Sequence, residues 1–254
     1  MGPGEVLIER MSWTDVRDAM AAGSRTVILP VAAMEQHGPH MAIGTDTFLG
    51  YETSERLARA LGDALVAPAI SIGYSVGHLP MPGTVTIAEE TLAQVITEVV
   101  DSLVHHGFTD VVLLSSHGGN YGALNMAVPG LRARHPAVRI HTRTSFDSSM
   151  EARAALLDEL GLDVARVGVH AAQGETSMML ACHPNLVDMS RAVEGFTGDA
   201  SIRWRAKVPP PMDEMSPTGI LGDARNSSVE LGERFLDSNV QEWVSAIRSG
   251  ELLN

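Results

Sequence analysis

The sequence comprises 254 residues, a length that suits one globular domain with a full hydrophobic core. It carries 18 basic and 31 acidic side chains, and the net charge of −13 argues against binding to nucleic acid or to an anionic membrane surface. The one cysteine, Cys182, cannot form an internal disulfide bond, and no run of about 18 apolar residues predicts a membrane span. We therefore expect a cytoplasmic protein in which histidines and carboxylates hold any bound metal.

Short apolar runs rich in β-branched residues alternate along the chain with longer stretches whose apolar residues recur at helical spacing. This alternation is typical of an α/β fold, with a mainly parallel β-sheet flanked by helices on both faces. Strands are expected at residues 26–31, 64–72, 110–115 and 138–142. Helices are expected at 46–61, before Gly107, at 120–134, at 147–160 and at the end of the chain from 229 to 247.

Local signals refine these expectations. Thr86 and Glu89 have the spacing of a capping box at the start of the second helix, and Pro129 is expected to disturb the third. The proline-rich stretch 207–212 predicts an extended loop, and the charges at 151–159 indicate a solvated helix face. We interpret residues 1–254 as a single domain with a loop-rich insertion around 185–226.

Histidines and carboxylates recur after successive strands, where the carboxyl ends of an open parallel sheet bind ligands. Glu35 and His37 follow the first strand, and because they are two residues apart their side chains point to one side of extended backbone. Asp46 could supply a bridging carboxylate and His117 another imidazole. A donor set without thiolates suits Zn, Mn or Fe(II). Each loop alone is also compatible with an ordinary turn, so the metal interpretation depends on their recurrence.

A different chemistry is suggested by Gly73-Tyr74-Ser75-Val76-Gly77, which matches the nucleophile elbow of serine hydrolases. An elbow must open a helix, and the prolines at positions 80 and 82 forbid a regular helix there. A serine hydrolase acting through Ser75 is therefore the less favoured alternative.

In their order along the chain, these segments resemble the creatininase family of metal-dependent amidohydrolases, over about residues 27–236. The matching stretches are Glu35-Gln36-His37-Gly38-Pro39-His40, Gly44-Thr45-Asp46, residues 78–84, His117-Gly118-Gly119-Asn120, His170-Ala171-Ala172, Glu175-Thr176-Ser177, Ser216-Pro217-Thr218-Gly219 and Gly222-Asp223.

The resemblance implies a creatininase-like α/β domain, two divalent metal ions per chain (Zn, Mn or Fe) and a homo-oligomer, a hexamer in this family. It further implies roles for six side chains: Glu35, His37, Asp46 and His117 as metal ligands with Asp46 bridging, Glu175 as the ligand that completes the second metal, and His170 as the proton-transfer residue. We assign His78 and Gly119 to substrate binding.

Two positions differ from creatininase itself, since Gly119 and Val169 stand where that enzyme has acidic residues. Both differences argue against creatinine as the substrate. We expect hydrolysis of a C–N bond in a small amide, cyclic amide or formamide through a metal-bridging hydroxide, with His170 passing a proton to the departing amine. The alternatives within the family are a peptidase of the mycofactocin-precursor type and a ring hydrolase of the dehydro-inosose type. Outside it stand the Ser75 hydrolase and a non-catalytic metal-binding scaffold.

Overall fold

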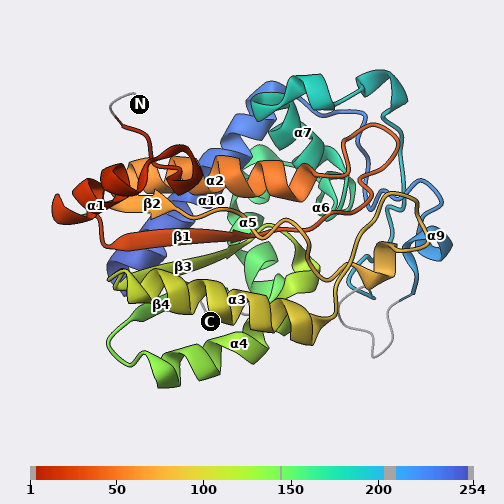
Figure 1. Cartoon of the computed structure of the whole chain (residues 1–254). Coiled ribbons are helices and arrows are strands. Elements are labelled where there is room, and N and C mark those ends of the chain that lie inside the picture. The colour runs from red at the N-terminus through yellow and green to blue at the C-terminus, as the bar shows by residue number, and fades with distance from the viewer. Residues whose placement is uncertain (1–3, 144, 203–209, 251–254) are drawn as a thin grey trace.

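The computed structural model describes residues 4–143, 145–202 and 210–250 (Figure 1). Four parallel strands form one sheet in the order β2-β1-β3-β4. The strands are β1 (Thr26–Val31), β2 (Ala64–Val66), β3 (Asp110–Ser115) and β4 (Arg139–Thr142). The chain passes from β1 to β2 on one side and returns to place β3 on the other, so the strand order reverses between β1 and β3. The predicted parallel α/β fold is confirmed.

The described helices fall into long elements that cover the sheet and short turns that lie in the loops. The α-helices are α1 (Trp13–Ala21), α2 (Thr45–Leu61), α3 (Glu89–His105), α4 (Tyr121–Arg134), α5 (Phe146–Leu160), α6 (Val164–Val167), α7 (Gln173–Cys182), α9 (Met212–Met215) and α10 (Val229–Ser249). The 3-10 helices are η1 (Ile8–Arg10), η2 (Val76–His78), η3 (Gly118–Asn120), η4 (Pro184–Leu186) and η5 (Met189–Arg191).

Side chains of the central strands alternate between two hydrophobic cores, as the period of a strand requires. Val27 and Leu29 of β1 point into a core with α3 and α4, whereas Ile28 packs into a second core with α2 and α10. In Figure 1 these two pairs of helices lie on opposite sides of the sheet. Because β1 and β3 are buried on both faces, their sequences are continuously apolar and easy to predict.

Three local expectations are wrong. Strand β2 ends at Val66 and not at residue 72, because Pro68 has no N–H for the ladder. Thr86 does not cap α3: the N-cap is Ala88, and the Thr86 hydroxyl accepts a hydrogen bond from the Ser75 amide instead. Helix α4 continues through Pro129 to its last residue.

Between α7 and α10, the described residues form loops and short helices. Residues 203–209 lie outside the described part, so the expected extended loop at 207–212 is seen only at its end, where Met212 already begins α9. Within the described ranges, no helix has both the length and the apolar composition needed to cross a bilayer.

Core packing on β3 makes a direct prediction about stability. Leu113 is fully buried between β1 and the α3–α4 layer, so Leu113→Ala should lower the free energy of unfolding by about 2–5 kcal/mol. Leu79 is half exposed, and Leu79→Ala should change it by less than about 0.5 kcal/mol. Urea denaturation of both variants measures the difference. Equal effects would contradict the assigned burial.

Candidate metal centre

The acidic and imidazole side chains identified in the sequence converge beyond the carboxyl ends of β1 and β3, at the point where the strand order reverses. Glu35 and His37 lie in the loop after β1, and His117 follows β3. Asp46 lies in the first turn of α2 and Glu175 in the first turn of α7. Five residues separated by up to 140 positions in the sequence thus meet at one edge of the sheet.

Asp46 lies at the centre of the group. Its Oδ1 is 3.3 Å from His37 Nε2 and its Oδ2 is 3.6 Å from His117 Nδ1. Glu35 Oε1 lies 3.3 Å from His117 Nδ1, and Glu175 Oε2 lies 3.7 Å from His37 Nε2. Two sets of three potential ligands result, Glu35–Asp46–His117 and His37–Asp46–Glu175, each with donor atoms within 4.8 Å of one another. The shared Asp46 has the position of a bridging carboxylate.

Backbone carbonyls orient both imidazoles. His37 Nδ1 lies 3.1 Å from the Glu35 carbonyl oxygen, and His117 Nε2 lies 3.0 Å from that of Tyr74. A carbonyl oxygen can only accept, so each of these nitrogens carries its proton and donates. The opposite nitrogen of each ring then faces the carboxylates, and it is the nitrogen that would bind a metal once its proton has left, as in metal-ligating histidines.

Several buried oxygen and nitrogen atoms that could bind a metal have no hydrogen-bond partner. They are Glu35 Oε1 and Oε2, His37 Nε2 and Asp46 Oδ2. Buried polar atoms normally find partners, because leaving a charged group both desolvated and unpaired is very costly. Carboxylate and imidazole donors that remain unsatisfied at short mutual distances fit two divalent cations sharing Asp46.

The closeness of these buried carboxylates and imidazoles also shifts their pKa values. Burial alone would lower the pKa of His37, but Asp46, Glu175 and Glu35 outweigh it and raise the pKa to about 10. Glu35 and Asp46 likewise outweigh burial at His117 and raise its pKa to about 9. Burial raises the pKa of the Asp46 and Glu175 carboxyl groups. Without cations, the cluster therefore holds protons that metal ions must displace.

Glu175 is held by an unusual backbone segment. Ala171 has a φ of +52°, in the left-handed region that costs a non-glycine residue about 1 kcal/mol. In this conformation its amide donates a 2.5 Å hydrogen bond to Glu175 Oε2. The strained turn between His170 and α7 therefore also orients a candidate ligand.

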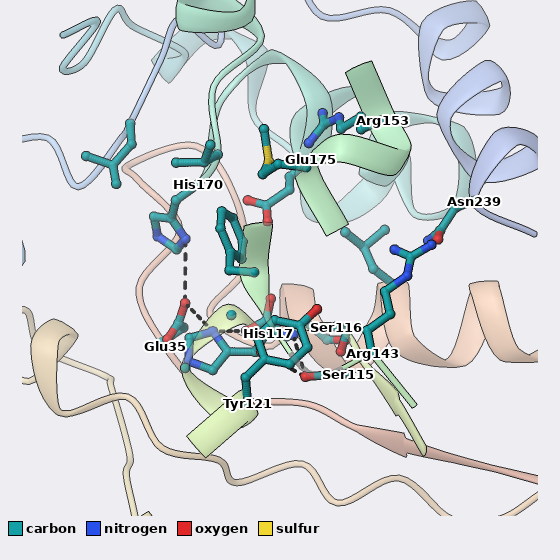
Figure 2. A pocket seen from close by; sticks show the side chains of 18 of the residues that line it. Glu35, Ser115, Ser116, His117, Tyr121, Arg143, Arg153, His170, Glu175 and Asn239 are labelled. Atoms are coloured by element: carbon teal, nitrogen blue, oxygen red, sulfur yellow. Dashed lines mark hydrogen bonds and ion pairs between the residues drawn. The ribbon is translucent and has the colours of Figure 1, made fainter. Parts of the chain in front are cut away.

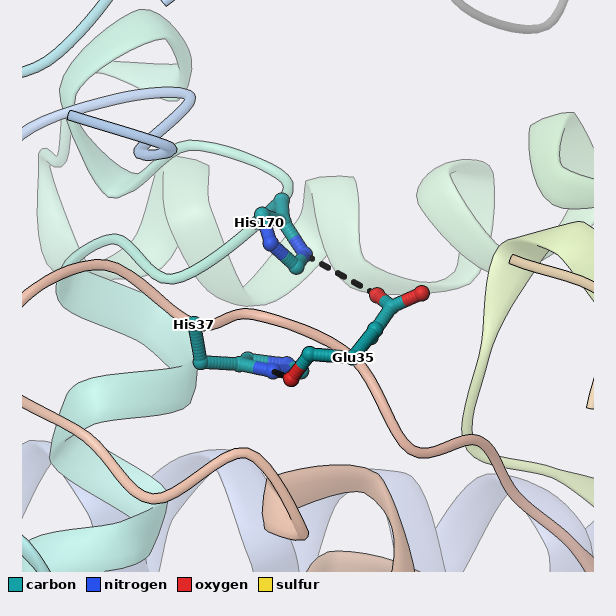
Figure 3. A group of neighbouring side chains, drawn as sticks. All are labelled: Glu35, His37 and His170. Carbon is teal, nitrogen blue, oxygen red and sulfur yellow. Dashed lines mark hydrogen bonds and ion pairs between the residues drawn. The ribbon is translucent and has the colours of Figure 1, made fainter. Parts of the chain in front are cut away.

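His170 lies beside the cluster, with its Nδ1 3.5 Å from Glu35 Oε1 (Figure 3). Its Nε2 is 2.9 Å from both the backbone carbonyl oxygen and the side-chain Nε2 of Gln36. The two protons of that amide are taken by His78 Nδ1 and the Gly219 carbonyl oxygen, so His170 Nε2 donates to the Gln36 carbonyl. Burial and the neighbouring His37 and His78 rings lower the pKa of His170 well below its usual range. The side chain is thus a neutral imidazole at pH 7 whose unprotonated nitrogen faces the site. His170 also forms a possible ligand set with Glu35 and His37.

The two residues assigned to substrate binding, His78 and Gly119, lie beside the carboxylates and imidazoles of this cluster. His78 is buried with its Nε2 3.8 Å from Glu35 Oε1, closer to the carboxylates than the sequence indicated. A Cβ at Gly119 would overlap His117 Nε2 and the Tyr74 carbonyl oxygen, so only glycine lets this loop pack against the imidazole. Both residues line the cavity described next, and their contact with substrate stays a prediction.

A cavity of about 540 Å³ opens from the cluster (Figure 2). One part is lined by Glu35, Asp46, His117, His170 and Glu175. The other part is lined by Tyr121, Arg143, Arg153, Phe235 and Asn239 among others. The expectation of a solvated face at 151–159 is therefore wrong at Arg153, which turns into the cavity, and at the buried Leu156 and Leu157.

Two amide side chains were missed as parts of the site. Gln36 Nε2 lies 3.1 Å from His78 Nδ1 and donates to the Gly219 carbonyl oxygen, which ties the loop after β1 to the late loops. Asn120 is fully buried; its Nδ2 donates to the carbonyl oxygens of residues 31 and 32, and its Oδ1 accepts from the Tyr74 amide. Both residues stand inside the motifs quoted above, but an amide in a sequence does not reveal its partner.

Ser75 lacks the surroundings of a nucleophile elbow. It is 2% exposed and is followed by the three-residue η2 and not by a long helix. Its Oγ lies 3.4 Å from His117 Nε2, but that nitrogen already donates to Tyr74 and cannot accept the hydroxyl proton.

Comparison with known proteins shows the family of this chain. The family model described as "Creatininase: Creatinine amidohydrolase" matches residues 9–247. The chain belongs to the creatininase family of amidohydrolases. The resemblance identified from the sequence motifs is thereby confirmed.

Similar proteins include enzymes with different substrates. Creatinine amidohydrolase of Pseudomonas putida is 31% identical, with 96% of each chain covered. The mycofactocin precursor peptide peptidase of Mycolicibacterium smegmatis is 29% identical, covering 87% of this chain and 84% of the peptidase. Among solved structures, a manganese form of creatininase superimposes with a TM-score of 0.80, and a variant of Zn–Zn type with 0.79. Each of the two is 28% identical and covers 97% of this chain and 98% of its own.

The raised imidazole pKa values predict that metal binding releases protons. At pH 7.5, adding Mn²⁺ to the chelator-treated protein should release about two protons per chain, because His37 and His117 are protonated before binding. The release should fall as the pH rises through 9 and 10. Calorimetric titration in phosphate and in Tris, which differ in ionisation enthalpy, measures the number. Identical heats in both buffers would contradict this protonation.

Proposed function

We propose that the chain hydrolyses a C–N bond in a small amide, cyclic amide or formamide, with two divalent cations at the site. Glu35, Asp46 and His117 would hold one cation, and His37, Asp46 and Glu175 the other. The observation that carries this proposal is the position of Asp46 between two sets of buried, unsatisfied donors.

The cations would activate a water molecule at neutral pH and polarise the substrate carbonyl. We assign the proton transfer to His170. Its Nε2–H is anchored on the Gln36 carbonyl oxygen, so its Nδ1 is the nitrogen that faces the reacting atoms. A neutral imidazole in this position can accept a proton from the attacking water and deliver it to the departing amine.

The volume of the cavity and the substrates of similar proteins support a small-molecule substrate. A cavity of about 540 Å³ lies in the range of small-molecule sites. Creatinine amidohydrolase and creatininase are among the similar proteins, but Gly119 and Val169 argue against creatinine itself. Because another relative is a peptidase, short peptides belong in the substrate panel. By the same resemblance we propose a cytoplasmic homo-oligomer, a hexamer.

Removing ligands and removing the proton carrier should have different effects. Glu35→Gln and Asp46→Asn should lose metal and activity together, whereas His170→Ala should keep about two metal equivalents while kcat falls by about 10²–10⁴. Metal is measured by elemental analysis of protein purified without added metal, and activity with amides, lactams, formamides and short peptides. The exposed His105→Ala serves as the control.

Three outcomes would contradict these assignments. Loss of metal from His170→Ala would make this residue a ligand, and full activity of that variant would remove its role. A metal-loaded protein inactive on the whole panel would favour the non-catalytic scaffold.

Ser75 allows a test of the alternative chemistry. Because His117 Nε2 donates to the Tyr74 carbonyl oxygen and cannot accept the Ser75 proton, Ser75→Ala should keep kcat within about threefold, and a fluorophosphonate probe should leave the protein unlabelled. A chelator should abolish activity. Labelling at Ser75 together with chelator-resistant activity would instead establish a serine hydrolase.

A further inference from the structure

Two arginines line the cavity beside the histidines and carboxylates of the candidate metal centre. Arg143 follows β4 and Arg153 comes from α5, and both line the cavity together with Asn239 and Glu242 of α10. In Figure 2, Arg143 and Asn239 lie on the right of the view and Glu35 and His170 on the left. A charged side chain that lines the cavity can contact a second polar group of a substrate whose amide lies at the cations.

Arg143 is already neutralised. Its Nη2 donates a 2.6 Å hydrogen bond to Glu242 Oε2, and its guanidinium lies 5.2 Å over the ring of Trp243. This pair contributes no net charge to the cavity.

Arg153 is different. Its Nε and Nη2 are buried and have no hydrogen-bond partner. Burial lowers the pKa of Arg153, because it outweighs the attraction of Glu175 and Glu242, the carboxylates whose charge acts on it without an ion pair. Its Cζ lies 4.4 Å from the centre of the Phe235 ring, so one face of the guanidinium is covered. The N–H edge of a guanidinium is the part that binds a carboxylate in a bidentate manner.

The neighbouring backbone is shaped to receive this side chain. A Cβ at Gly174, in the first turn of α7, would overlap Arg153 Nη2 and its Cζ. The guanidinium therefore occupies space that only glycine leaves open, next to the candidate ligand Glu175. Leaving such a charge buried and unpaired is costly unless a ligand supplies the opposite charge.

We propose that the substrate carries a carboxylate and that Arg153 binds it while the amide group lies at the cations. This inference rests on the proposed function and specifies its substrate class: small amides that also carry one anionic group. Arg153 then acts as a specificity-determining residue.

Matched probes that differ only in charge test the proposal by binding and not by turnover. Succinamate, glutaramate and adipamate each carry one amide and one carboxylate, and their diamides replace the carboxylate with an uncharged group. Calorimetry with the metal-loaded protein should show at least one acid binding about tenfold or more tightly than its diamide. Arg153→Met should abolish this preference, and the exposed Arg17→Met should retain it.

An equal preference in Arg153→Met, or none in the unaltered protein, would overturn the proposal. If Arg153→Met loses its metals or its cooperative melting, the Arg153→Lys variant is used instead, because lysine keeps the charge but lacks the planar guanidinium. Arg153→Lys should show a reduced preference for the acid over its diamide. An unchanged preference would overturn the proposal. Failure of the proposed function is a separate result. Hydrolysis without charge preference would refute only the Arg153 assignment, and charge-selective binding without hydrolysis would refute only the proposed reaction.

Discussion

The structure depends on the burial of negative charge that the protein alone does not neutralise. Glu35 and Asp46 are almost completely removed from solvent. Glu35 Oε1 and Asp46 Oδ2 have no hydrogen-bond partner and lie on the same imidazole nitrogen, His117 Nδ1, at 3.3 and 3.6 Å. Removing a carboxylate from water costs several kcal/mol unless an opposite charge lies close by. Two imidazoles offset part of this cost by holding protons, and divalent cations would add the positive charge that the carboxylates still lack. Without such compensation the buried carboxylates would repel each other.

The fold serves this constraint by bringing rigid elements together at one point. Strands β1 and β3 pair over six residues, so the segments that follow them leave the sheet side by side. Helices α2 and α7 then present Asp46 and Glu175 from their first turns, where the helix dipole favours a carboxylate. Asn120 ties the loops after β1 and β2 to the start of α4 through backbone hydrogen bonds. The candidate ligands therefore lie on backbone that other residues hold in place.

Sequence reasoning succeeded where a local pattern has one physical meaning. Strands β1 and β3 were predicted to the residue, because continuous β-branched runs bounded by polar residues suit only doubly covered strands. It failed where a side chain had a choice of partners. Thr86 hydrogen-bonds to Ser75 and not to its own helix, and Arg153 sits among charges typical of an exposed face yet turns inward over Gly174. Which partner a side chain contacts is decided by residues distant in the sequence, and the residues around it do not reveal that partner.

The central claim is that two cations share Asp46, and anomalous diffraction tests it most directly. Crystals grown with Mn²⁺ should show two anomalous peaks about 3.5–4 Å apart, one beside Glu35 and His117 and the other beside His37 and Glu175. A single peak, or peaks at the separate group formed by Glu52, Cys182 and His183, would contradict the account.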